Sequence, residues 1–151
     1  MTDQERVARL MTEVGPLDDD IVEVAQTSDD SWAIRFEDVD IEVERDPLGG
    51  RLVLSAEIAV PRREDRVTVY EALLSYSMLW RETGGLRMAL AEPGGAAVQL
   101  VDVSIADLTP KLLATVAANL AERTLVWRAF LASDQQDEQT FNPLTDMGIK
   151  I

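Results

Sequence analysis

Two neighbouring segments alternate apolar and polar residues, and this alternation constrains the fold of the chain more than any other feature. In residues 39–44 every odd position is apolar and every even position carries a carboxylate. A turn at 46–50 leads into residues 52–60, where every second residue is again apolar. A two-residue period places the two kinds of side chain on opposite faces of a strand. We therefore expect an antiparallel sheet with one face on a core and the other in water.

A helix with two apolar faces is predicted from about residue 67 to residue 82. One face carries Val69, Ala72, Leu73, Tyr76, Leu79 and Trp80. A second ridge, on roughly the opposite side, carries Tyr70, Leu74 and Met78. A helix that is apolar over most of its circumference must be covered from two sides. The sheet covers one ridge, so we expect another part of the chain or, preferably, a second copy to cover the other.

The first residues predict a short amphipathic helix. Thr2 and Glu5 have the spacing of a capping box, and Gly15 and Pro16 end the helical pattern. Between them lies one narrow apolar stripe, which consists of Val7, Leu10, Met11 and Val14. Residues 17–31 are rich in acids, and we interpret them as a loop that contains a short strand near 21–25.

The remaining pattern predicts a strand at 32–36, a hairpin formed by 86–90 and 97–103, and a final helix that begins at Pro110. Without the short segment near 21–25, the order is α-β-β-β-α-β-β-α. This order predicts a single α+β domain over residues 1–132, with an antiparallel sheet flanked by helices. We expect residues 133–151, which begin with a polar run, to form a flexible tail.

The composition excludes several classes of function. The 151 residues include 28 acidic and 14 basic side chains, no His and no Cys, for a net charge of −14. Without Cys there are no disulfides or thiolate nucleophiles, and without His there is no imidazole base. The negative charge argues against nucleic-acid and anionic membrane partners. The lack of an 18-residue apolar run and the acidic N-terminus predict a cytoplasmic protein without membrane insertion.

Carboxylates are the only abundant candidates for chemistry. Asp40, Glu42 and Glu44 share a strand face, and three acids follow one another at 18–20. The alternation favours a solvated face for the first group, and the second lacks the spacing of a calcium loop. The serines have no His to activate them. We therefore predict no catalytic residue, metal ligand or cofactor, and keep a metal-dependent hydrolase as the weakest alternative.

Three features in sequence order suggest a family. They are the strand pair at 39–44 and 52–56, the helical segment 70–79 that leads into 84–90, and a long terminal helix with Trp127 ahead of Phe130 and Leu131. Together they resemble the CesT-type (class I) chaperones of bacterial type III secretion. The chain departs from the family at Ser77, where many members have Asn.

This resemblance implies a homodimeric binding protein without enzymatic activity. The two-fold interface would include Tyr70, Leu74, Met78, Leu86 and Met88. The protein would bind the N-terminal region of one or more secreted effectors and keep it unfolded and export-competent. Binding would use strand addition to an exposed sheet edge and an apolar patch that comprises Val7, Leu10, Met11, Ile34 and Phe36. The secretion-apparatus ATPase is a further implied partner.

The distribution of charge adds one expectation about the client. Residues 1–60 contain 16 acidic and five basic side chains, so we expect them to favour basic effector segments. The alternative to the chaperone function is a regulatory or interaction protein of the same fold without a secreted client, as in the YbjN-like family.

Overall fold

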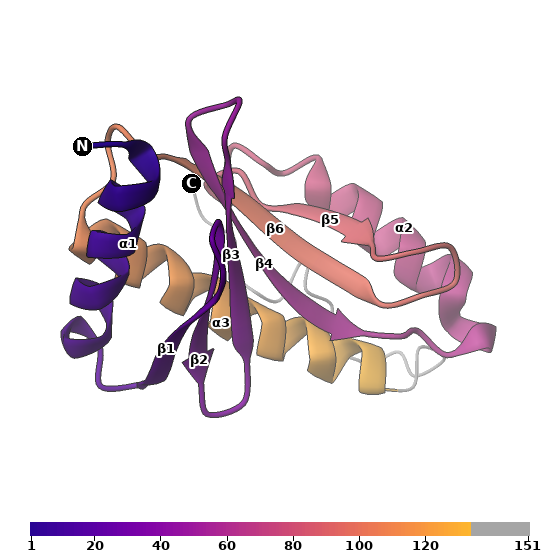
Figure 1. The fold of residues 1–151 in the computed structure, drawn as a ribbon. Helices are drawn as coiled ribbons and strands as arrows, with labels where there is room; N and C mark the ends of the chain where they lie inside the picture. Colours follow the sequence, from indigo (N-terminus) through magenta and orange to yellow (C-terminus); the bar gives the residue numbers. More distant parts are fainter. Residues whose placement is uncertain (134–151) are drawn as a thin grey trace. The chain divides into compact units, whose positions relative to one another are not determined.

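The structure, a computed structural model, describes residues 1–133. These residues form a six-stranded antiparallel sheet and three α-helices (Figure 1). The strand order in the sheet is β1-β2-β3-β4-β6-β5. The predicted α+β class is therefore confirmed. The helices are α1 (Asp3–Val14), α2 (Arg66–Ser77) and α3 (Pro110–Ala132). The strands are β1 (Ile21–Ser28), β2 (Ser31–Phe36), β3 (Asp40–Asp46), β4 (Arg51–Ala59), β5 (Arg87–Leu90) and β6 (Ala97–Ser104).

Contacts between residues divide the chain into two compact units. Unit 1 consists of Met1–Ala56 and Asp102–Glu122, and unit 2 consists of Glu57–Val101 and, among the described residues, 123–133. Strands β4 and β6 and helix α3 contribute residues to both units. Each unit has its own buried apolar residues.

Two predicted boundaries need correction. The segment expected to be a loop with a short strand near 21–25 is the eight-residue strand β1, so four strands rather than three precede α2. The acid-rich sequence did not suggest a full strand here, but pairing with β2 holds residues 21–28 in the extended conformation. Helix α2 ends at Ser77, five residues earlier than predicted, because residues 78–85 form turns in which Leu79 donates to the Tyr76 carbonyl and Gly85 to that of Trp80.

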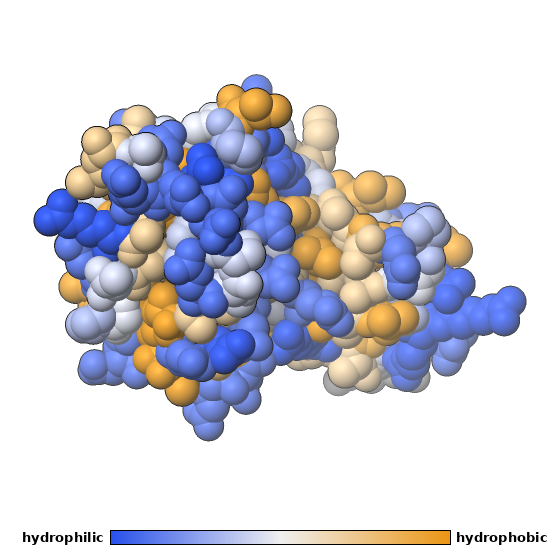
Figure 2. Space-filling model, viewed as in Figure 1, coloured by the Kyte–Doolittle hydropathy of each residue, from blue (hydrophilic) through white to orange (hydrophobic). Residues whose placement is uncertain are grey.

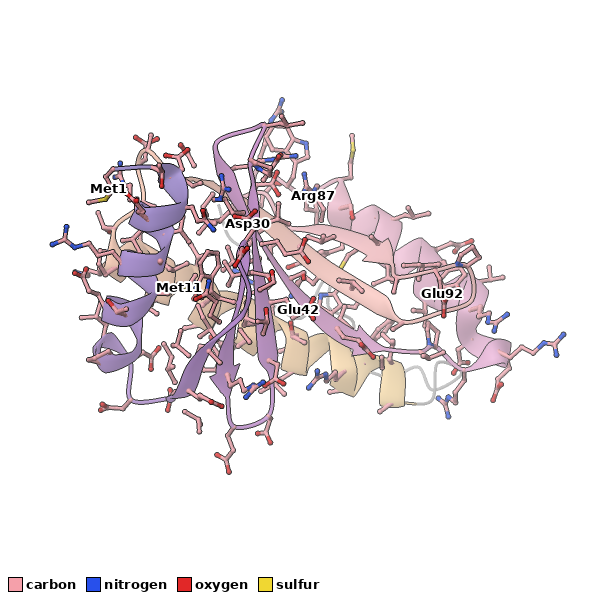
Figure 3. All side chains as sticks on the ribbon, viewed as in Figure 1. Met1, Met11, Asp30, Glu42, Arg87 and Glu92 are labelled. Carbon is pink, nitrogen blue, oxygen red and sulfur yellow. The ribbon has the colours of Figure 1, made fainter. Side chains whose placement is uncertain are left out.

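In unit 1, helix α1 buries its single apolar stripe. The predicted capping box is confirmed: Thr2 Oγ1 accepts from the Glu5 amide at 3.1 Å, and Glu5 Oε2 accepts from the Thr2 amide at 3.1 Å. The four stripe residues are buried, and α1 contacts β1. In Figure 3 Met11 lies on the side of α1 that faces β1. The strands and the first part of α3 supply most of the rest of this core, in which Ile34, Ile41, Leu52, Leu54 and Leu113 are fully buried.

In unit 2, the core includes an aromatic cluster. The rings of Tyr76 and Trp127 meet edge to face with centroids 5.0 Å apart, and Phe130 meets Trp127 in the same way at 5.6 Å. Tyr76 and Trp127 are both fully buried, and the Tyr76 hydroxyl accepts from Arg123 Nη1 at 3.3 Å. Arg128 donates to the carbonyls of residues 57 and 58 at the end of β4. These contacts hold the C-terminal part of α3 on α2 and β4.

The turn between β3 and β4 depends on one carboxylate. Asp46 accepts from the Leu48 amide at 3.0 Å and from Arg51 Nε at 3.1 Å, and Arg51 also bonds Asp102. Gly49 leaves room for this arrangement, since a Cβ there would come within 2.7 Å of the Asp46 carboxylate. The Leu48 amide, and then Arg51, lower the pKa of Asp46.

This lowered pKa predicts a pH-dependent stability. The folded state favours the ionised form of Asp46. Its contribution to the free energy of unfolding is therefore complete above the ordinary Asp pKa of about 3.9 and is lost as the pH falls through the lower pKa of the folded state. Asp46→Asn should therefore lower the free energy of unfolding at neutral pH, and the difference from wild type should shrink below about pH 4. Urea unfolding followed by tryptophan fluorescence measures it. The exposed control Asp19→Asn should show no such convergence; a constant Asp46→Asn difference across this range would contradict the account.

Candidate functional site

An apolar groove lies between α2 and β5 in unit 2. It has a volume of about 190 Å³ and is lined by Tyr70, Leu73, Leu74, Met88, Ala89 and Leu90. Beside it, Leu74 is 71% exposed and Met78 is 79% exposed. Apolar surface is visible over α2 and β5 in Figure 2. Within residues 1–133, the second ridge of the helix is therefore not covered by the chain itself.

The residues predicted for a two-fold interface do not all reach this groove. Tyr70, Leu74 and Met88 line it together, with Tyr70 and Met88 half-buried. Met78 continues the exposed ridge without lining the groove. Leu86 is only 4% exposed and belongs to the core of unit 2. Val67 is 72% exposed at the start of α2. At 100° per residue, it lies on the same side of the helix as Leu74 and Met78.

A serine that the sequence analysis left without a role fixes the geometry of this groove. Ser77 Oγ donates to the Leu73 carbonyl at 3.2 Å and accepts from the Met88 amide at 2.9 Å. It therefore joins the last turn of α2 to β5, which stands at the end of the strand order next to β6. The sequence singled out Ser77 only as a departure from the family pattern. It could not predict the bond to the Met88 amide, because that bond depends on where β5 lies.

The other end strand, β1, presents a blunted edge. Its pairing with β2 skips Val22 and Thr27, so each is the extra residue of a bulge. Residues 23–26 between them pair regularly with β2. Bulges are one way in which proteins protect an edge from unwanted strand pairing. Here they confine the regular edge to four residues.

The predicted effector-contacting residues are mostly buried. Val7 and Ile34 are 0% exposed, Leu10 and Met11 are below 8%, and Phe36 is half-buried. Leu10 also lines a groove of about 470 Å³ on α1, which includes Met1, Asp3, Arg6, Arg9, Glu13 and Leu108. In Figure 3 Met1 lies at the start of α1. Leu10 thus borders a surface, whereas Val7 and Ile34 face the interior, and their proposed role stays a prediction.

Charge is divided unequally between the two units. Unit 1 contains 18 acidic and six basic side chains, whereas the described residues of unit 2 contain six acidic and seven basic ones. The carboxylates of Asp40, Glu42 and Glu44 lie at exposed positions of β3, as the alternation predicted. Glu23 on β1 pairs with Arg35 on β2 at 2.6 Å. The acidic surface therefore belongs to unit 1, which also carries the β1 edge.

The described residues form neither a metal-binding cluster nor a membrane-spanning helix. Among residues 1–133 no three or more His, Cys, Asp or Glu side chains come together in a way that would hold a metal ion. None of the helices in the same part of the chain is long and apolar enough to span a bilayer.

Comparison with known proteins shows which family the chain matches and which solved structures have a similar fold. The model of the Tir chaperone protein (CesT) family matches residues 20–128. No curated protein matches the chain in sequence. Several solved structures are similar over most of the chain, and because their identity to it is low they show the fold alone.

A chain in the crystal structure of the ExsC-ExsE complex has a TM-score of 0.72 and 21% identity, with 88% of this chain and 100% of that chain covered. For a chain of the HopA1-SchA chaperone-effector complex, the TM-score is 0.64 at 15% identity, with 83% of this chain and 94% of that chain covered. For the Yersinia pestis type III secretion chaperone SycH in complex with a stable fragment of YscM2, the TM-score is 0.60 at 16% identity, with 83% of this chain and 99% of that chain covered.

The bond between Ser77 and the Met88 amide predicts a specific loss of stability. Ser77→Ala leaves that part-buried amide without its acceptor, which should cost about 1–2 kcal/mol of unfolding free energy. Ser77→Asn keeps an acceptor at this position and should restore part of the loss. Chemical unfolding measures both, with Ser75→Ala at an exposed position of the same helix as the control. Equal effects of Ser77→Ala and Ser75→Ala would refute the role given to Ser77.

Proposed function

The chain belongs to the Tir chaperone protein (CesT) family, so it is a type III secretion chaperone rather than an enzyme, and we propose that it holds the N-terminal region of one or more effectors unfolded and competent for export. The observation that carries this proposal is the family match over residues 20–128. The family match also favours this function over that of a YbjN-like protein without a client.

The β1 edge supports strand addition as the mode of binding. An extended client segment that pairs with residues 23–26 would use main-chain hydrogen bonds, which place little demand on client sequence. The bulges at Val22 and Thr27 limit this pairing to a short stretch. Exposed Val22, Leu17 and the groove that Leu10 borders offer apolar contacts beyond that stretch, on the same unit.

The charge of unit 1 supports a basic client segment. Its 18 acidic and six basic side chains give a net charge of −12. Such a field steers a basic partner toward the surface and weakens as salt screens it. A client segment rich in Lys or Arg on either side of the paired strand fits this surface.

The exposed side of α2 supports a homodimer. Val67, Leu74 and Met78 expose most of their side-chain surface, and Tyr70 and Met88 border the adjacent groove. A second copy that places the same ridge against this one would form an isologous interface and bury both. The secretion-apparatus ATPase as a partner, and the cytoplasmic location, stay predictions from the family resemblance.

Purification of the tagged chain from a secreting host tests the proposed function. We expect a protein exported by the type III apparatus to co-purify, and deletion of its N-terminal region to abolish the association. Deletion of the gene for the chain should reduce export of that client but not of unrelated effectors. Unchanged export of every effector in the deletion strain would overturn the function.

Proline substitutions in β1 test strand addition. Neighbouring residues of a strand point their amides to opposite edges, so of Val24→Pro and Ala25→Pro one removes an outward amide and the other an amide directed at β2. The variant that retains the wild-type melting temperature should bind its client at least 10-fold more weakly in a calorimetric titration. Full client affinity in that folded variant would exclude pairing at residues 23–26.

A charge on the exposed ridge tests the dimer. Leu74→Asp would bury a carboxylate in the proposed interface, which should raise the dimer dissociation constant by on the order of 100-fold. Light scattering after size-exclusion chromatography measures the mass of the particle. The control is Leu48→Asp, which makes the same change at a 97% exposed position in the β3–β4 turn. A monomeric wild type would contradict the proposed dimer. So would a Leu74→Asp variant that stays dimeric at the lowest protein concentration at which the wild type is dimeric.

A further inference from the structure

The hydrogen bonds at the two ends of β2 show in which direction its main-chain groups point. The Asp30 carbonyl accepts from the Arg45 amide, and the Phe36 amide donates to the Val39 carbonyl, both at 2.8 Å. Both pairs extend the antiparallel register of β2 with β3. Along such a ladder, directly opposite residues alternate between bonded and non-bonded pairs. The even-numbered residues of β2 therefore bond to β3, and the odd-numbered residues direct their amides and carbonyls at β1.

Val24 and Gln26 consequently direct their main-chain groups away from β2. Their neighbours Glu23 and Ala25 lie opposite odd-numbered residues of β2 and bond to that strand. Because β1 stands at the end of the strand order, the amides and carbonyls of Val24 and Gln26 point to the side where a strand can be added. A client segment that pairs with these two residues places each of its side chains on the same face as the β1 residue opposite it.

A row of alternating charges crosses the sheet and ends at this edge. Asp40 on β3, Arg35 on β2 and Glu23 on β1 stand directly opposite one another. Arg35 Nη1 lies 2.6 Å from Glu23 Oε2, and Arg35 Nε lies 4.0 Å from Asp40 Oδ2. The Glu23 side chain is still 52% exposed. The row runs negative, positive, negative toward the edge, so a positive charge on an added strand would continue it.

The position opposite Glu23 is also the one at which a side chain of the client comes closest. Since Glu23 bonds to β2, it forms a non-bonded pair with the client residue opposite it, and such pairs have the shorter separation. Glu23 is the only acid within β1. The next row on the same face runs through Ala25 and Ala33 to Glu42 on β3, which is two strands, about 10 Å, farther from the edge.

We propose that Glu23 selects clients that place a Lys or Arg directly opposite it when they pair with Val24 and Gln26. This inference rests on the proposed chaperone function, to which it adds the register of the client strand and one side-chain requirement. The Glu23 carboxylate then lies between the client cation and Arg35. Opposite charges across adjacent strands stabilise the pair and like charges destabilise it, so a client with Asp or Glu at this position binds more weakly.

Disulfide trapping identifies the opposing residue by distance rather than by charge. The chain has no Cys, so Glu23→Cys provides a unique thiol. The probe is the N-terminal region of the co-purified effector, freed of its own Cys and given a single Cys at each position in turn. The highest yield of mixed disulfide is expected at a position where the wild-type effector has Lys or Arg. Ala25→Cys should trap the residue two positions away, because alternate residues of a strand share a face.

A charge swap then measures the selection. Glu23→Lys should raise the dissociation constant of the wild-type probe about fivefold, because it replaces attraction with repulsion across the strands. Changing the trapped Lys or Arg of the probe to Glu should have the same effect, and the combination of both changes should restore most of the affinity. The control Glu42→Lys makes the same charge change at an exposed position of the same face. It should alter the dissociation constant less than twofold at 0.15 M salt, where the screening length is about 8 Å.

Two results would overturn the proposal and leave the chaperone function in place. One is a highest trapping yield at an apolar or acidic residue of the effector. The other is an equal loss of affinity in Glu23→Lys and Glu42→Lys. A disulfide between two copies of the Glu23→Cys variant that forms in preference to the effector adduct would assign the edge to a second copy and so also overturn it. Failure of the chaperone function itself is distinct, because no exported protein would then co-purify with the chain.

Discussion

The two apolar faces of α2 are the constraint on which unit 2 depends. One face is satisfied within the chain, where Tyr76 packs edge to face on Trp127 and Ser77 accepts from the Met88 amide. The other face leaves Leu74 and Met78 exposed beside an apolar groove. Burying such a surface is worth about 25 cal/mol for each Å² removed from water. Covering this second face would therefore be favourable.

In unit 1, the proposed strand addition requires a sheet edge that is open to a client but not to every other strand. Its net charge of −12 and the bulges at Val22 and Thr27 both discourage non-specific pairing. What remains is a short regular stretch, residues 23–26, next to a strongly acidic surface. The two units therefore differ strongly in net charge.

Period-2 alternation was enough to predict β3 and β4, and the capping box was enough to place α1, because these signals are local. Strand β1 was underestimated since most of its exposed residues are polar and its two bulges interrupt the period. The two faces of α2 were predicted from helical spacing. The bond from Ser77 was not, because it depends on where β5 lies. Likewise, the burial of Val7 and Ile34 depends on packing, which a stripe on one helix does not reveal.

Hydrogen exchange on the chaperone with and without its co-purified client tests the central claim, that the chain holds an extended client segment on its β1 edge. We expect the amides of residues 23–26 to gain protection in the complex, while the bound client segment shows protection only along the strand that pairs with them. Unchanged exchange in β1, together with a client segment protected throughout as a folded domain, would contradict the account.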